Sequence, residues 1–170
     1  AFSGGATSGD FKWAEFGLQI LGGRWVAHHG AHKKEGTRSV FETVNLKHPV
    51  LRGVEEIFGT TDVYAVKNLD LSKATILLRG AVTESLHDRS YPIKGPKNDP
   101  MQALAWLFEY KTPDGKGTGK SFCTTMGASV DFVDEDLRRL IVNAAFHLLG
   151  TEVPAKAKVD FIDPFNPTNY

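Results

Sequence analysis

The chain has 170 residues, of which 41% are hydrophobic and 24% are charged. This composition is typical of a globular domain with a buried core and excludes a wholly disordered chain. The 20 basic side chains are balanced by 20 acidic ones, so charge gives no reason to expect a nucleic acid or an anionic membrane as partner. No apolar run approaches the roughly 20 residues that span a bilayer, so no membrane span is expected.

The first half of the chain predicts short strands after one helix. Apolar spacing from Asp10 predicts an amphipathic helix over residues 10–21, which Gly22 and Gly23 would end. The Trp and Val content of Arg24–His28 predicts a strand. Further strands are expected at residues 39–44, 62–66 and 74–79, with one or two helical turns within 50–57.

The second half begins with a polar loop from Gly80 to Pro100, and loops of this length are usually functional or disordered. Two strands at 103–110 and 120–125 are then joined by TPDGKGTG, which predicts a hairpin. This stretch is not a phosphate loop, because three residues separate Gly115 from Gly119, whereas the phosphate-loop motif needs four. A helix is expected over 134–149. Taken alone, about six strands and two helices indicate an α+β fold.

The stretch WVAHHGAHKKEG places His28, His29 and His32 within five residues. An HxxxH pair on a helix could bind zinc, but this segment is predicted as a strand and Gly30 follows it. Neighbouring side chains of a strand point to opposite sides, and the glutamate of an HExxH motif is absent. No metal site is therefore predicted. A strand end that delivers one or two histidines to a cleft and a solvated loop both remain open.

Three other groups are candidate functional residues. Cys123, the single cysteine, lies in the middle of a predicted strand without a cationic neighbour, so a structural role is favoured over a nucleophilic one. The turn from Thr125 to Ser129 follows the last strand, at the kind of position where ligands collect in open α/β sheets. Asp131 and Asp134 fit acidic residues at a helix start better than catalytic groups.

Several stretches resemble the ThuA-like (trehalose-utilisation) domains of the class I glutamine amidotransferase-like superfamily. The resemblance spans most of the chain and includes an HP-V-x-x-G segment followed by D-x-Y. It is carried by FGLQILGGRWVAHHG, KHPVLRGVEEIFGTTDVYAV, KNDPMQALAWLFEYKTPDGKGTGKSFCTTMGAS and DLRRLIVNAAFHLLG.

The resemblance implies an α/β, flavodoxin-like three-layer sandwich whose N-terminal strands would lie upstream of Ala1. Residues 1–150 would form about the C-terminal two-thirds of the ThuA-like domain, and 151–170 an extended tail. An oligomer or a partner chain would then cover the sheet edge left open. Export to the periplasm or outside the cell is favoured over a cytoplasmic location.

The function that the resemblance implies is action on, or binding of, a small-molecule carbohydrate such as a glycoside or keto-sugar, without a cofactor. His29 is expected to act as general acid–base, because an imidazole can transfer protons near neutral pH. The family's Gly-His pair is here Gly127-Ala128, so a second hypothesis is that the protein is a non-catalytic carbohydrate-binding or assembly module. A third is an amide or ester hydrolase whose nucleophile lies upstream. The side chains expected to bind substrate are His28, His32, Arg79, Asp99, Thr125 and Ser129.

Overall fold

A five-stranded antiparallel sheet lies at the centre of the molecule, with the strand order β3-β2-β5-β6-β7. The structure is a computed structural model that describes Trp13 and residues 15–168. A separate two-stranded antiparallel ribbon pairs β1 with β4. The strands are β1 (Arg24–His28), β2 (Thr37–Phe41), β3 (Phe58–Gly59), β4 (Tyr64–Lys67), β5 (Ala74–Val82), β6 (Gln102–Lys111) and β7 (Thr118–Thr124). The helices are α1 (Glu135–Leu148), the π-helical η1 (Gly17–Leu21) and the 3-10 helices η2 (Thr43–Asn45), η3 (Pro49–Leu51) and η4 (Ser129–Val133).

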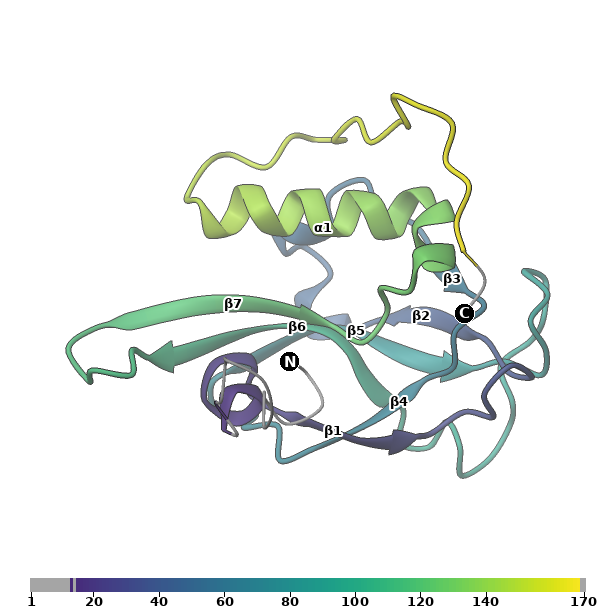
Figure 1. Cartoon of the computed structure of the whole chain (residues 1–170), viewed down its shortest axis with the longest axis horizontal. Coiled ribbons are helices and arrows are strands. Elements are labelled where there is room, and N and C mark those ends of the chain that lie inside the picture. The colour runs from purple at the N-terminus through teal and green to yellow at the C-terminus, as the bar shows by residue number, and fades with distance from the viewer. Residues whose placement is uncertain (1–12, 14, 169–170) are drawn as a thin grey trace.

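The sheet is covered on both faces (Figure 1). Helix α1 lies over one face, and a core there includes Leu77, Leu104 and Leu140. The β1–β4 ribbon and η1 lie over the other face, where Trp106 and Phe108 form the centre of a second core. Central strands buried on both sides need no polar alternation. This explains the unbroken apolar run that begins β5.

The mixed α/β content agrees with the prediction, whereas a flavodoxin-like sandwich is not confirmed. That fold is built on a parallel sheet, but every strand pair in residues 15–168 is antiparallel. The α+β pattern read from the order of strands and helices is closer to what the structure contains. The short connection between the end of β6 at Lys111 and the start of β7 at Thr118 favours antiparallel pairing of these two strands, since a parallel pair needs a long crossover.

Several predicted elements are confirmed and others move by a few residues. The strand Arg24–His28 and the hairpin between β6 and β7 are confirmed. The predicted 80–100 loop is shorter, because β5 continues to Val82 by pairing with β2. The first helix is reduced in the described residues to η1, which ends at Gly22 in a left-handed conformation (φ 85°). Asp10, its expected N-cap, lies outside the described residues.

Helix α1 begins as its sequence predicts and packs against both the sheet and the tail. The Asp134 carboxylate caps it by accepting a hydrogen bond from the Leu137 N–H at 2.8 Å. The tail runs over α1 without regular secondary structure (Figure 1). It is held there by Arg139, whose Nε donates to the Ala157 carbonyl at 3.2 Å, and by Arg138, whose Nε donates to the Val159 carbonyl at 2.8 Å. No helix within the described residues is long and apolar enough to cross a membrane.

His48 should make stability depend on pH. Its Nδ1 accepts a hydrogen bond from the Val50 N–H at 3.2 Å, and its ring lies 4.9 Å from that of His147. Burial, followed by the positive fields of His147 and Lys120, lowers the pKa of His48. The His48 imidazole therefore takes up a proton less readily in the folded protein than in the unfolded chain. The stability that the neutral His48 contributes is present above the ordinary pKa of 6.5 and is lost as pH falls below it.

We expect the free energy of unfolding to decrease as pH is lowered from 7.5 towards 5, and His48→Gln to reduce that dependence. Urea denaturation across this range, with His87→Gln as a matched exposed histidine, measures the effect. Identical pH profiles for wild type and His48→Gln would contradict it.

Candidate functional site

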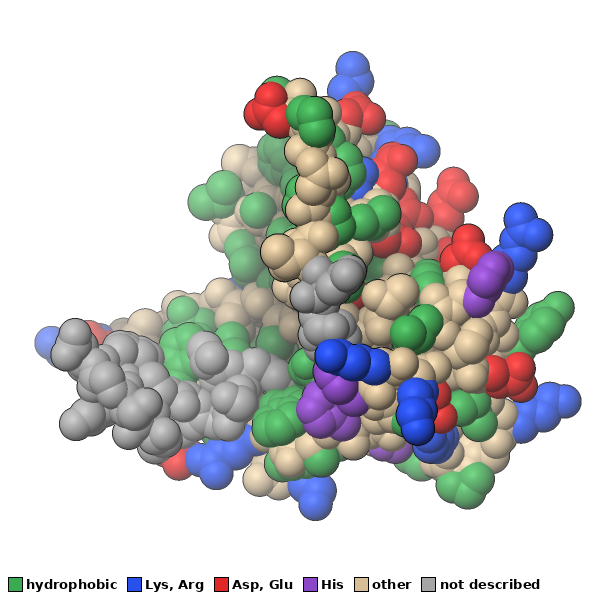
Figure 2. Space-filling view, turned by 45° about the vertical axis from the view of Figure 1, so that its right-hand side comes forward, with side chains coloured by type: hydrophobic (Ala, Val, Ile, Leu, Met, Phe, Trp, Pro, Cys, Tyr) green, Lys and Arg blue, Asp and Glu red, His purple; other side chains and the backbone are tan. Residues whose placement is uncertain are grey.

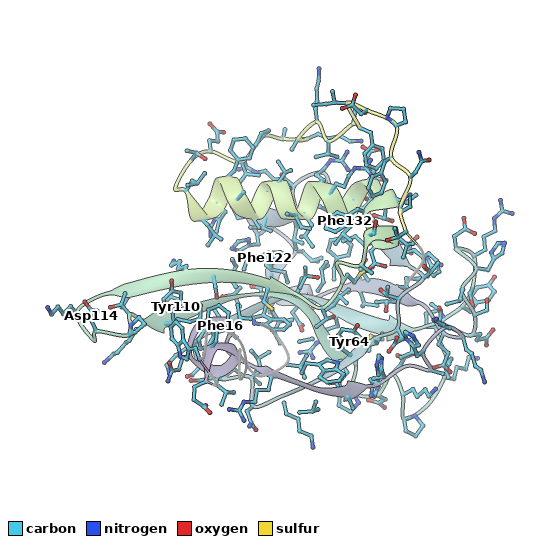
Figure 3. The ribbon with its side chains drawn as sticks, in the orientation of Figure 1. Phe16, Tyr64, Tyr110, Asp114, Phe122 and Phe132 are labelled. Carbon is cyan, nitrogen blue, oxygen red and sulfur yellow. The ribbon has the colours of Figure 1, made fainter. Side chains whose placement is uncertain are left out.

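The ribbon of β1 and β4 gathers three rings at one place. Pairing sets His28 opposite Tyr64, and a bulge shifts the register between Trp25 and Ala27. In a regular strand, residues three apart point to opposite faces, but the extra residue of a bulge restores them to one face. The rings of Trp25 and His28 are accordingly 5.7 Å apart, and that of Tyr64 is 5.4 Å from His28, both edge to face. Tyr64, the first residue of β4, is labelled in Figure 3.

Asp62 lies at the base of this group and binds both of its exposed histidines. One carboxylate oxygen is 2.8 Å from Nδ1 of His28, and the other is 3.1 Å from Nδ1 of His32. The Asp62 side chain is fully buried, whereas those of His28 and His32 are 45% and 40% exposed. The carboxylate is thus fixed inside the protein while both imidazoles reach solvent. Figure 2 shows histidine side chains grouped on this side of the molecule. We call His28, His32, Asp62 and Tyr64, with Trp25, the Asp62 cluster.

Gly30 allows the loop after β1 to pass close to Asp62. A Cβ at Gly30 would lie 3.0 Å from the Cβ of Asp62, tighter than side chains normally approach. The N–H groups of His29 and Gly30 both donate to the Val63 carbonyl, at 2.8 and 3.0 Å. These bonds fix the loop against β4, so that His32 folds back onto the same carboxylate as His28.

His29 points elsewhere and anchors the long loop between β5 and β6. Its Nε2 lies 2.7 Å from the Lys97 carbonyl, a contact in which the imidazole N–H donates. Nearby, the Lys97 ammonium is 2.6 Å from Glu35, whose carboxylate also accepts from the Ala31 N–H. Burial acts to raise the pKa of Glu35, but Lys97 and the Ala31 N–H together hold it below its usual range. His28 and His29 therefore face different partners, as strand alternation predicts.

The turn predicted as part of the site is tied to the residue before Asp62. Asp131, almost completely buried, accepts the Thr61 hydroxyl at 2.8 Å and the N–H groups of Gly127 and Ala128 at 2.9 and 3.1 Å. Burial raises the pKa of Asp131 despite these bonds. Burial, followed by the charges of Asp62 and Asp131, also raises the pKa of Tyr64, so its phenol stays protonated at neutral pH.

The remaining predicted substrate-binding residues are spread over the sheet and its loops. Arg79 pairs with Glu42 at 2.6 Å and donates to the Met101 carbonyl. Asp99 is exposed in the long loop. Thr125 donates its N–H to the Leu104 carbonyl, and Ser129 begins η4. No described hydrogen bond or ion pair joins these four side chains to the Asp62 cluster, and whether they bind a substrate stays a prediction.

Asp62 and Tyr64 belong to the candidate site but were not predicted from the sequence as site residues. Both belong to the D-x-Y segment, Asp62-Val63-Tyr64, on which the family resemblance partly rests. That segment was a signal for them, but nothing in its spacing indicates that it meets residues some 30 positions earlier. Only the antiparallel pairing of β1 with β4 makes that connection.

Two other features carry less chemistry. Cys123 is buried, and this burial raises the pKa of its thiol to about 12, which agrees with a structural cysteine. A mainly apolar hollow of about 630 Å³ lies between η1 and the β6–β7 hairpin, lined by residues such as Leu18, Phe108 and Tyr110. Its lining contains no histidine. The reactive groups therefore indicate the Asp62 cluster as the site.

No protein-family model, curated protein or solved structure matches the chain. Any function proposed for it therefore depends on the geometry of the Asp62 cluster and on the residues that carry the resemblance.

Proposed function

We propose that the protein binds a small carbohydrate at the Asp62 cluster and acts on it there, as a ThuA-like domain would on a glycoside or keto-sugar. The observation that carries the proposal is a fully buried carboxylate that orients two exposed imidazoles beside aromatic rings. Sugars present both hydroxyl groups and an apolar face. A site with ring surfaces and a few fixed polar groups can bind both. The flavodoxin-like sandwich that the resemblance implies belongs to the same proposal, although the strand pairs within residues 15–168 are antiparallel.

In this proposal His28 is the general acid–base, in place of His29. With the Nδ1 proton donated to Asp62, the Nε2 of a neutral His28 holds a lone pair that can accept a proton from a sugar hydroxyl or an acidic C–H. A carboxylate that fixes the tautomer of a catalytic histidine is a recurring arrangement in enzymes. The bond from His29 to the Lys97 carbonyl already uses its Nε2, which supports a structural role for that residue.

The proposal predicts that His28→Gln lowers turnover by roughly 10²–10⁴-fold, the usual contribution of a general acid–base. Substrates would be screened from disaccharides, including trehalose, and their keto derivatives, with products identified by mass spectrometry. Both His28 and His29 lie at the end of β1, so His29→Gln is the informative comparison, and the exposed His87→Gln is the neutral control. Lost turnover in His29→Gln with normal turnover in His28→Gln would return the assignment to His29.

A non-catalytic carbohydrate-binding module is the second candidate. The observation that favours it is the absence of a histidine at Ala128, where the resemblance expects a Gly-His pair. The N–H groups of Gly127 and Ala128 are bonded to Asp131 instead. Saturation-transfer NMR on the same sugars distinguishes the two. Binding that is weakened by Trp25→Ala, without any product from the wild type, would favour the module.

A further inference from the structure

We propose that His28, His32 and Asp62 form a binding site for a divalent transition metal ion of the zinc type. One ligand atom from each of the three residues lies within 4.8 Å of the other two. The inference concerns the same cluster as the proposed function but does not rest on it, since metal binding requires no sugar.

The donor set selects the class of metal. Two imidazole nitrogens and one carboxylate oxygen suit Zn²⁺, Co²⁺ or Ni²⁺, whereas Mg²⁺ and Ca²⁺ prefer oxygen donors. Sites with three protein ligands and an open position are characteristic of catalytic rather than structural zinc. The side chains of His28 and His32 are 45% and 40% exposed, so water or a ligand hydroxyl could reach an ion bound to them.

The spacing of the donors is close to that of a metal site. Zinc bonds to nitrogen and oxygen of about 2.0–2.2 Å place tetrahedral ligand atoms roughly 3.3 Å apart. The two Nδ1 atoms lie 2.8 and 3.1 Å from the oxygens of Asp62. These are contacts with two different oxygens, and the three donor atoms together lie within 4.8 Å of one another. Rotation of the exposed imidazoles would bring their nitrogens around one ion, while the buried carboxylate stays where it is. The edge contacts of Trp25 and Tyr64 with His28 would limit how far that ring can turn.

This arrangement also changes the interpretation of the histidine-rich stretch. The absence of a metal site was predicted because His28 and His29 face opposite sides of a strand. His29 follows β1 and contacts the Lys97 carbonyl instead of Asp62. The second donor is His32, which the loop at Gly30 returns to Asp62. The third donor, Asp62, lies far from both histidines in the sequence, so no short sequence motif contains all three residues. To bind the ion through Nδ1, each imidazole would carry its ring proton on Nε2.

Isothermal titration calorimetry of the full chain with Zn²⁺, in the absence of sugar, tests the inference. We expect one Zn²⁺ bound per chain and no saturable binding of Mg²⁺. His32→Gln and Asp62→Asn should each weaken Zn²⁺ binding by at least the roughly 10–100-fold that loss of an outer partner costs. His29→Gln is the matched control and should bind like the wild type.

Histidine ring NMR of the unmodified chain provides a second test that does not depend on how the variants fold. Zn²⁺ should shift the ring signals of His28 and His32 and leave those of His29 and His87 unchanged. Shifts confined to the His48–His147 pair, or Zn²⁺ affinity unchanged in both His32→Gln and Asp62→Asn, would overturn the inference. Zinc binding without sugar turnover supports the metal site while removing the proposed activity. Sugar turnover in a chain that binds no zinc would support the proposed activity and overturn the metal site.

Discussion

Replacing Trp106 with alanine should lower the free energy of unfolding by about 3–5 kcal/mol, the usual cost of removing a large aromatic side chain from a core. Trp106 lies in the middle of β6, and its side chain is completely buried. It forms the centre of the core that joins the sheet to η1, and its indole N–H donates to the Leu21 carbonyl at 2.7 Å. The alanine variant would leave a cavity and an unpaired carbonyl at the end of η1.

Urea denaturation monitored by circular dichroism measures this change. Trp106→Phe keeps most of the ring and should lose clearly less stability than Trp106→Ala. Trp25→Ala is the matched control, because that indole is only half-buried on the thin β1–β4 ribbon. If Trp106→Ala cost no more than Trp25→Ala, the core around Trp106 would not stabilise the fold as described.

Replacing Asp131 with alanine should cost about 2–4 kcal/mol, because it leaves the buried Thr61 hydroxyl and two partly buried N–H groups without an acceptor. The Asp131 carboxylate binds the Thr61 hydroxyl and the N–H groups of Gly127 and Ala128. These bonds connect the turn after β7 to the residue that precedes Asp62. The alanine variant should therefore lose stability and also weaken the ordering of the Asp62 cluster.

Asp131→Asn should have an intermediate effect with two opposing parts. The raised pKa of Asp131 means that burial of its charge is unfavourable, and a neutral amide removes that cost. The amide NH₂, however, would face groups that are themselves donors. Urea denaturation of both variants, with the exposed Asp114→Ala as control, measures the difference. Equal stability of wild type and Asp131→Ala would show that these hydrogen bonds do not stabilise the turn.

The sequence alone determined the local elements whose signals lie within a few residues. The strand Arg24–His28, the hairpin between β6 and β7, and the helix that Asp134 caps all follow from side-chain pattern and turn chemistry. The buried, structural character of Cys123 follows in the same way from its place in a strand. The strand boundaries were less accurate, because pairing with a neighbour decides where a strand ends, as β5 extends to Val82 alongside β2.

Only the tertiary structure decided that the strands pair antiparallel and which residues form the candidate site. Alternation predicts that His28 and His29 diverge, but not that a bulge brings Trp25 to the same face as His28. Asp62 enters through pairing between strands far apart in sequence, and its burial depends on everything packed around it. Single-sequence patterns report the conformation of neighbouring residues, whereas a site built from distant segments exists only once their long-range contacts have formed.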